Sequence, residues 1–196
     1  LVDDIGIGFM FAPNYHPAMK HVAPVRKELK LRTIFNLLGP LTNPASAKNQ
    51  VVGVYSKELT RIFAEVLKKL GSRHVLCVHG ADGMDEISIT DKTYIAELKN
   101  GKILEYVFNP QDYGIKLGRI KDIEVADIES SKEMMLGILN GDKNTARDIT
   151  ILNSGAALYV SGICSDFESA FEVSAKMIDE GLALKKLRQL IKQSNE

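Results

Sequence analysis

Residues 50–78 read QVVGVYSKELTRIFAEVLKKLGSRHVLCV, and this stretch decides the fold of the chain. Residues 50–55 and 74–78 are apolar and rich in β-branched side chains, which predicts two buried strands. Between them, residues 57–70 carry apolar side chains at helical spacing, at positions 59, 62, 63, 66, 67 and 70. Gly71 follows as the expected helix C-cap. Such a strand–helix–strand unit favours parallel pairing through a right-handed crossover.

A hairpin and three helices are predicted downstream. Residues 93–98 and 102–108 flank Asn100-Gly101, a strong signal for a hairpin turn. Helices are expected over 130–139, 144–160 and 167–191, and the last begins with Ser165 and Glu168 at capping-box spacing. We therefore predict an α/β fold with a mixed, largely parallel sheet flanked by helices.

Prolines divide the beginning of the chain into short helices. Pro17 suits the first position of one helix, and Pro24 starts a second over residues 25–29. A third helix, residues 33–38, is expected to stop at Gly39-Pro40.

Length and composition restrict the class of protein. The 196 residues fit one α/β domain spanning 1–196, and 45% hydrophobic with 26% charged residues is ordinary for a soluble globular protein. Lys and Arg number 25, as do Asp and Glu, and this balance disfavours a nucleic-acid binder. No apolar run reaches the roughly 18 residues of a membrane span, and no signal peptide is recognisable, so we expect a cytoplasmic protein. The chain begins with Leu1 and not Met, which leads us to expect part of a longer gene product or a sequence whose start is not included.

The two cysteines, Cys77 and Cys164, lie far apart and do not form a disulfide framework. We expect two buried thiols in a reducing compartment.

Two segments near the beginning of the chain carry polar groups that a pure scaffold does not need. Residues 14–20 (NYHPAMK) are followed by Arg26 and Arg32, whose guanidinium groups match carboxylates or phosphates. His16 also has a purely structural interpretation as a hydrogen-bonded histidine. Residues 35–44 (FNLLGPLTNP) predict a rigid loop, which is either simple turn chemistry or a wall for a small planar ligand.

An acidic loop is predicted after the second strand. Residues 79–86 read HGADGMDE, and ligands of open α/β sheets bind beyond the carboxyl ends of strands. Asp85 and Glu86 supply the hard oxygen ligands that Mg²⁺ takes together with water and substrate phosphates. The alternative is a solvated acidic loop without a metal.

Together these segments resemble the anthranilate phosphoribosyltransferase family over nearly the whole chain. The resemblance rests on FAP (11–13), HPAMK (16–20), PVRKEL (24–29), RTIFN (32–36), LGPLTNP (38–44), GMDE (83–86) and NSGAALY (153–159). One departure is Lys30, where the family usually has Gly at a helix end. A larger departure is that the sequence contains no Gly-Thr-Gly-Gly-Asp loop, the family's pyrophosphate cradle, which lies upstream with a small helical domain.

The resemblance implies a fold, a reaction and site residues. The fold is that of the large domain of the nucleoside phosphorylase and phosphoribosyltransferase class. The reaction moves a phosphoribosyl group from phosphoribosyl pyrophosphate to anthranilate with Mg²⁺, in a homodimer without nucleic-acid or membrane partners. Asp85 and Glu86 are the expected metal ligands. The expected anthranilate-binding residues are Arg26, His16, Pro13, Tyr15 and Pro40.

No catalytic base is assigned, and the 196-residue chain alone is expected to fold but to be inactive. Two alternatives stay open at this point. A pyrimidine nucleoside phosphorylase shares the fold but fits the first motif block less well. A non-catalytic nucleic-acid-binding relative is disfavoured by the charge balance.

Overall fold

A mixed sheet of four strands, in the order β1-β2-β3-β4, organises the computed structural model, which describes residues 1–10, Tyr15, Glu28 and 35–195. The elements are α1 (Val2–Ile5), α4 (Phe35–Leu41), β1 (Asn49–Gly53), α5 (Lys57–Lys69), β2 (His74–Gly80), β3 (Thr93–Lys99), β4 (Lys102–Phe108), η1 (Pro110–Tyr113), η2 (Ile120–Asp122), α6 (Ile128–Leu139), α7 (Thr145–Ser161), α8 (Phe167–Asp179) and α9 (Leu182–Ser194). The chain divides into two compact units, one of Leu1–Ser46 with Lys185–Glu196 and one of Ala47–Leu184.

The pairing of the strands confirms the mixed sheet and corrects its balance. β1 and β2 are parallel, as predicted for a strand–helix–strand unit, while β2–β3 and β3–β4 are antiparallel. Among the described strands, antiparallel pairs therefore outnumber parallel ones, and "largely parallel" is wrong. The Asn100-Gly101 turn explains part of the difference, because both residues adopt positive φ, 51° and 73°, and so close a tight hairpin.

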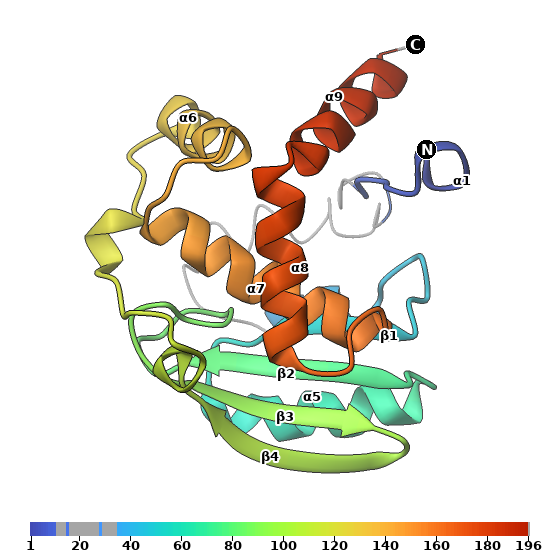
Figure 1. Cartoon of the computed structure of the whole chain (residues 1–196). Coiled ribbons are helices and arrows are strands. Elements are labelled where there is room, and N and C mark those ends of the chain that lie inside the picture. The colour runs from blue at the N-terminus through green and yellow to red at the C-terminus, as the bar shows by residue number, and fades with distance from the viewer. Residues whose placement is uncertain (11–14, 16–27, 29–34, 196) are drawn as a thin grey trace. The chain divides into compact units, whose positions relative to one another are not determined.

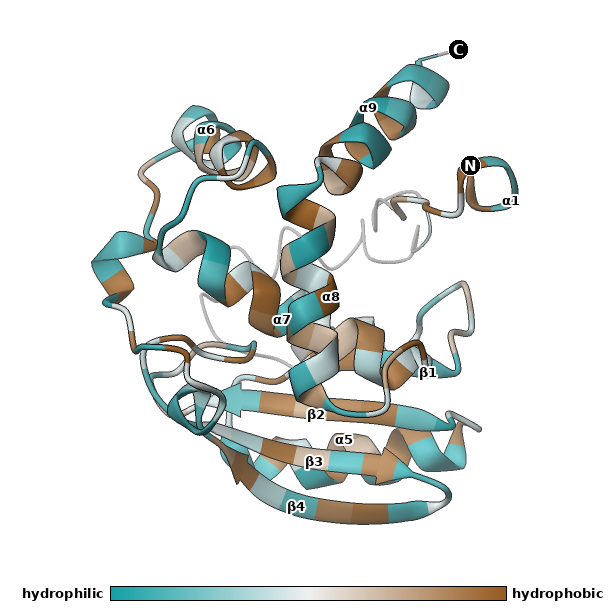
Figure 2. Ribbon diagram, viewed as in Figure 1, coloured by the Kyte–Doolittle hydropathy of each residue, from teal (hydrophilic) through white to brown (hydrophobic). Residues whose placement is uncertain are grey.

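The sheet is buried on both faces, which explains the continuous apolar run of β2. α5 packs on one face of the sheet, and α7, with α8 beside it, covers the other (Figure 1). Leu76 and Val78 join the core cluster that includes Ile149 and Leu152 of α7. The alternate residues of β2 point to the opposite face, toward α5. The middle of β2 is accordingly hydrophobic in Figure 2.

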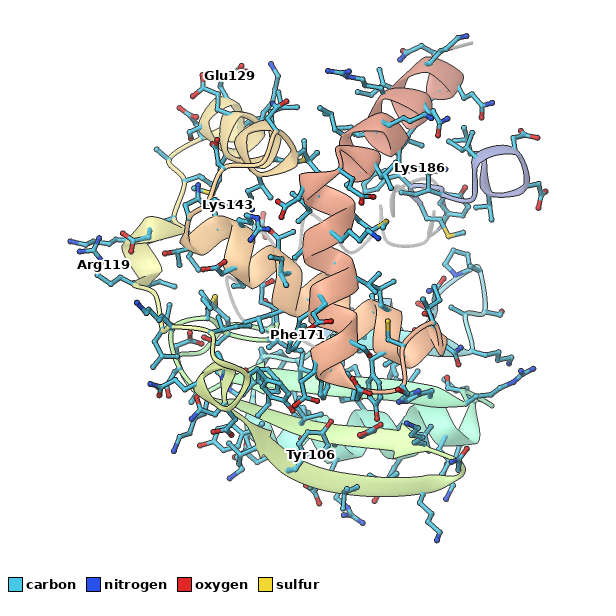
Figure 3. All side chains as sticks on the ribbon, in the orientation of Figure 1. Tyr106, Arg119, Glu129, Lys143, Phe171 and Lys186 are labelled. Carbon is cyan, nitrogen blue, oxygen red and sulfur yellow. The ribbon has the colours of Figure 1, made fainter. Side chains whose placement is uncertain are left out.

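Aromatic side chains fill the layer between the sheet and α8. Phe108 at the end of β4 stacks on Tyr113 with 5.0 Å between ring centroids, and Phe167 stacks on Phe171 at 5.7 Å. Figure 3 shows Phe171 within this layer. Edge-to-face contacts at 6.0 and 5.4 Å join Tyr113 to Phe167 and Phe171, so η1 is anchored on α8.

The predicted helix signals were confirmed at some ends and wrong at others. Gly71 stops α5 with φ 84°, and its N–H donates to the Lys68 carbonyl oxygen at 3.1 Å, but the C-cap itself is Leu70, one residue earlier than predicted. The predicted helix over 167–191 is instead two helices, because Gly181 adopts φ 69° between α8 and α9. The cap of α8 is Asp166, whose carboxylate accepts from the Ser169 N–H at 2.8 Å, and not Ser165 with Glu168.

The predicted stop at Gly39-Pro40 is also wrong, because α4 continues through both residues to Leu41. Pro40 lies in the last turn of a seven-residue helix, where its missing N–H removes a single helical bond. The predicted helices around Pro17 and over 25–29 lie outside the described residues, apart from Glu28.

The first unit is described by a few local contacts. α1 ends at Gly6, which has φ 73° and donates its N–H to the Val2 carbonyl oxygen. Lys186 of α9 donates from Nζ to the Ile5 carbonyl oxygen at 2.7 Å. This contact joins residues from opposite ends of the chain within one unit.

Both thiols are buried, as predicted, and burial raises the pKa of Cys77 to about 12. Within the described parts of the chain, none of the helices has the length and apolar character that crossing a membrane requires.

Candidate functional site

The acidic loop follows β2 at the carboxyl end of the strand, and its backbone is fixed by a tight turn. Gly83 donates its N–H to the Gly80 carbonyl oxygen at 2.9 Å, and Gly80 donates to the Met84 carbonyl oxygen at 2.8 Å. Gly83 adopts φ 97°, which other residues rarely do. Shortly after Gly83, the chain re-enters the core, where Ile87, Ser88 and Ile89 are fully buried.

Asp82 serves the architecture of this loop. Ser88 donates its hydroxyl to the Asp82 carboxylate at 2.5 Å, Thr90 donates to the same oxygen, and the Met84 N–H donates to the other at 3.1 Å. Desolvation alone would raise the pKa of Asp82, but these hydrogen bonds outweigh it and lower the pKa. Asp82 is thus an ionised, fully engaged carboxylate.

Two residues outside the loop hold the acidic pair in place. Asn153 of α7 accepts from the Ile87 N–H at 2.9 Å and donates to the Ile87 carbonyl oxygen at 2.9 Å, so one amide clamps both backbone groups of that residue. Gly53 of β1 lies under the backbone of Asp85, where an added Cβ would stand 1.5 Å from the Asp85 carbonyl oxygen. Only glycine leaves room for this approach.

Asp85 and Glu86 themselves are exposed, and within the described residues neither has an ion-pair partner. The pKa of the Glu86 carboxyl is raised by desolvation and by the negative charges of Asp85 and Asp82. A cation between the two exposed carboxylates would relieve this repulsion.

The donor set fits Mg²⁺ that is shared with a phosphate-bearing substrate. Where the structure describes the chain, no three His, Cys, Asp or Glu side chains are grouped to hold a metal. Two carboxylates at a loop edge leave most of an octahedral shell to water and phosphate oxygens, which is how Mg²⁺ is usually bound with such substrates. The geometry of the loop is therefore compatible with the predicted metal site at Asp85 and Glu86.

The predicted acceptor side is described only in part. Tyr15 is 49% exposed, and Pro40 is half-buried within α4. Both belong to the first unit, whereas Asp85 and Glu86 belong to the second. The remaining predicted residues, Pro13, His16 and Arg26, lie outside the described residues.

Asn153 and Gly53 were not predicted to serve the loop. Asn153 appeared only inside a resembling stretch, and its partner lies 66 positions away. For Asn153, the available signal was a polar amide at a helix position that turns toward the sheet. For Gly53, it was a glycine inside an otherwise β-branched strand, which often marks a close backbone approach.

A second polar cluster lies toward the other end of β2 and β3. Glu97 is 8% exposed, and its carboxylate lies 2.8 Å from His74 Nε2. Tyr159 of α7 donates its hydroxyl to the same carboxylate at 2.8 Å, and Tyr106 of β4 donates at 3.0 Å. Lys99 in turn donates from Nζ to the Tyr159 hydroxyl at 2.9 Å. This Glu97 cluster joins three strands to α7, and its carboxylate already has three partners.

Comparison with known proteins places the fold. The sequence pattern of the glycosyl transferase family, a/b domain, matches residues 1–184. The chain is 54% identical to anthranilate phosphoribosyltransferase of Methylobacillus flagellatus, over 96% of this chain and 55% of that protein. It therefore spans about half the length of the curated relatives that it matches.

Solved structures give the same result. The crystal structure of anthranilate phosphoribosyltransferase from Thermus thermophilus superposes with a TM-score of 0.88 at 35% identity, covering 97% of this chain and 56% of that one. The Saccharomyces cerevisiae enzyme in complex with PRPP and Mg superposes with a TM-score of 0.80 at 27% identity, covering 90% of this chain and 51% of that one.

Proposed function

This chain belongs to the glycosyl transferase family with this a/b domain, and we propose that the full-length protein is an anthranilate phosphoribosyltransferase. The reaction transfers the phosphoribosyl group of phosphoribosyl pyrophosphate to the amino group of anthranilate, giving N-(5-phosphoribosyl)anthranilate in tryptophan biosynthesis. The observation that carries this proposal is 54% identity to a protein of that name across 96% of the chain. A homodimeric, cytoplasmic enzyme is part of the same proposal.

The reaction requires the protein to stabilise developing charges and to position the two substrates. As the bond at the anomeric carbon breaks, positive charge develops on the ribose and negative charge on the departing pyrophosphate. Bound Mg²⁺ would neutralise part of the pyrophosphate charge. Asp85 and Glu86 would hold that ion, and the clamp by Asn153 and Gly53 would keep both carboxylates in register with the substrate.

The acceptor side of the proposed site depends on residues at the beginning of the chain. Arg26 would bind the anthranilate carboxylate through its guanidinium fork. His16, Pro13, Tyr15 and Pro40 would form the wall against which the flat ring lies. Holding the amino group in line with the anomeric carbon converts an encounter in solution into a reaction between fixed neighbours.

The proposal is tested by assaying the full-length protein for loss of anthranilate fluorescence with phosphoribosyl pyrophosphate and Mg²⁺. Phosphorolysis of thymidine, run in parallel, should be absent. Turnover of thymidine without turnover of anthranilate would replace the proposed reaction by that of a nucleoside phosphorylase.

A substitution of Arg26 tests the proposed anthranilate-binding site in the same assay. Arg26→Ala should raise the anthranilate KM about ten- to a hundredfold, because a charge-assisted pair is lost, and should leave the KM for the phosphoribosyl donor nearly unchanged. Arg73→Ala, on the loop before β2, is the matched control and should change neither KM. Equal effects of Arg26→Ala on both substrates would remove the assignment.

A further inference from the structure

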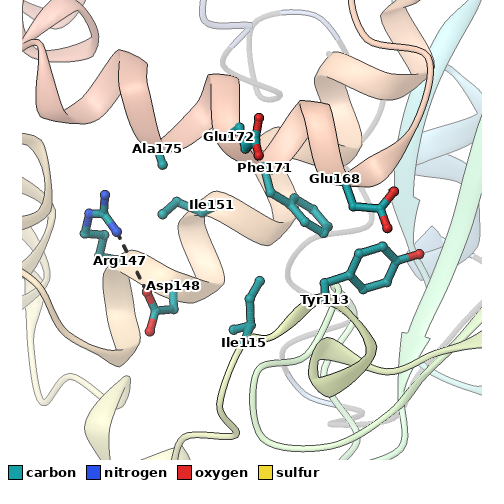
Figure 4. Close-up of a pocket in the computed structure, with 9 residues that line it drawn as sticks. All are labelled: Tyr113, Ile115, Arg147, Asp148, Ile151, Glu168, Phe171, Glu172 and Ala175. Atoms are coloured by element: carbon teal, nitrogen blue, oxygen red, sulfur yellow. Dashed lines mark ion pairs between the residues drawn. The ribbon is translucent and has the colours of Figure 1, made fainter.

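A pocket of about 330 Å³ lies within the second unit, apart from the acidic loop (Figure 4). It is formed by the last residue of η1 and the chain just after it, by α7 and by α8. Its lining consists of Tyr113, Ile115, Arg147, Asp148, Ile151, Glu168, Phe171, Glu172 and Ala175. Its volume is within the range of small-molecule sites.

The floor of the pocket is apolar and well packed. Ile151 and Phe171 are 6% and 7% exposed, so they present one side to the pocket and are otherwise buried. Tyr113 meets Phe171 edge-to-face with 5.4 Å between ring centroids. Methylene groups laid on such a surface leave water favourably.

The rim of the pocket is acidic, and the cation in its lining, Arg147, is engaged by a carboxylate outside the lining. Arg147 donates from Nη2 to both oxygens of Asp179 at 2.9 and 3.0 Å, and Lys143 binds the same carboxylate. The contact of Arg147 with Asp148 is much longer, at 3.9 Å. Three carboxylates, Asp148, Glu168 and Glu172, stand against the guanidinium of Arg147, so the lining carries a net negative charge.

The environment of Asp148 supports this charge balance. Desolvation raises the pKa of its carboxyl in spite of Arg147 and Lys143. Glu168 and Glu172, four residues apart on α8, also repel each other across one helical turn. All three carboxylates would gain from a cationic ligand.

The carboxylates are spread along the pocket and not gathered at a point. Glu168 and Glu172 are separated by about 6 Å along the axis of α8, at about 1.5 Å per residue. Asp179 lies about 16 Å along α8 from Glu168. Arg147 binds Asp179, so its chain neighbour Asp148 lies toward that far end of the helix. Figure 4 shows Asp148 toward one end of the pocket and Glu168 toward the other, with Ile115 and Ile151 between them.

We propose that this pocket binds a linear aliphatic polyamine. An extended polyamine places ammonium groups at intervals of a few carbon atoms, which suits three carboxylates along a groove, while its methylene segments cover the apolar floor. A compact dication would reach only one end, and an anion would be repelled.

Isothermal titration of the full-length protein with spermidine tests the proposal, together with the diamine 1,5-diaminopentane and the uncharged 1,5-pentanediol. We expect saturable binding of one spermidine per chain, weaker binding of the diamine and none of the diol. Each of Asp148→Asn, Glu168→Gln and Glu172→Gln should weaken binding about two- to fivefold, and the triple variant should abolish it. Glu180→Gln removes an exposed acid just after the same helix and outside the pocket, and it should have no effect.

A filling variant separates the pocket from general surface charge. Ala175→Leu leaves every charge in place but occupies the apolar floor, and it should weaken spermidine binding at least about tenfold. Circular dichroism identifies any variant that fails to fold, and the exposed Glu168→Gln and Glu172→Gln variants then carry the test. The proposal is overturned if wild-type protein shows no saturable binding, if Glu180→Gln weakens binding as much as Glu168→Gln, or if folded Ala175→Leu binds normally.

Discussion

The two ends of the β2–β3 pair use carboxylates in opposite ways. Toward one end, Glu97 is buried and receives hydrogen bonds from Tyr159 and Tyr106, with His74 at 2.8 Å. At the other end, Asp85 and Glu86 are exposed, and the hydrogen bonds there hold the backbone that carries them. A carboxylate surrounded by donors stabilises the fold, whereas one held in place without donors remains available to a cation.

The largest effect should come from closing the space under the acidic loop. Gly53→Ala places a Cβ 1.5 Å from the Asp85 carbonyl oxygen, so the loop must move. Because a displacement of about 1 Å in a positioned group can reduce a rate about a hundredfold, kcat/KM for phosphoribosyl pyrophosphate should fall by about that factor. Steady-state kinetics of the full-length protein measure it.

Gly101→Asn in the β3–β4 turn is the control for Gly53→Ala. An added Cβ there meets open space, and Asn tolerates the left-handed backbone conformation. Its activity should match that of the wild-type protein. If Gly53→Ala is equally active, the loop position does not matter for the reaction.

The next effect should appear in stability and not in metal dependence. Glu97→Ala removes a buried carboxylate from three partners and should lower the free energy of unfolding by about 3 kcal/mol, as measured by urea denaturation. The Mg²⁺ concentration for half-maximal activity should be unchanged in the folded variant. Glu105→Gln, an exposed partner of Arg61 on β4, should change stability by less than about 1 kcal/mol.

The Glu97 experiment can also contradict the comparison between the two ends of the β2–β3 pair. A Glu97→Ala protein that is as stable as Glu105→Gln would show that the buried network contributes little. A shift in its Mg²⁺ dependence would show that the two ends of the sheet are coupled.

The smallest effect concerns pH. The pKa of Glu86 is raised in the folded state, so the folded protein binds that proton more tightly than the unfolded chain. Ionised Glu86 therefore reduces stability as pH rises from the unfolded pKa through the raised folded one. Without Mg²⁺, the thermal stability of Glu86→Gln relative to wild type should increase as pH rises above about 4, near the unfolded pKa, and added Mg²⁺ should reduce the gain. Glu133→Gln on α6 should show no such trend, and a gain that does not vary with pH would contradict the assigned repulsion.

Local signals predicted the framework of the second unit well. The apolar run of β2 and the helical spacing of α5 decide those elements within their own residues. Positive φ marks the end of α5 at Gly71 and the turn between β3 and β4 at Asn100-Gly101. Predictions failed where two local signals competed. Asp166 supplies a carboxylate for the cap of α8 beside the expected Ser165, and Gly181 interrupts what the periodicity alone continues.

The residues that hold the candidate site in place could not be predicted from short stretches of sequence. Asp85 and Glu86 were found from their place after a strand, but the Asn153 clamp joins residues 66 positions apart and the Tyr159–Glu97 contact joins residues 62 apart. Such pairs follow from how α7 packs on the sheet, which no short stretch of sequence encodes. The one visible hint for Glu97 was an acidic residue inside the apolar strand 93–98.

The most direct test of the account is the Mg²⁺ titration of the full-length Asp85→Asn/Glu86→Gln variant, assayed with anthranilate and phosphoribosyl pyrophosphate. Asp91→Asn, on the same connection between β2 and β3, is the matched control and should titrate like wild type. The account predicts that the double variant needs at least about tenfold more Mg²⁺ for half-maximal rate, with no loss of melting temperature in the absence of substrate. A titration curve that superimposes on that of the wild-type protein would contradict it and leave the pair as a solvated acidic loop.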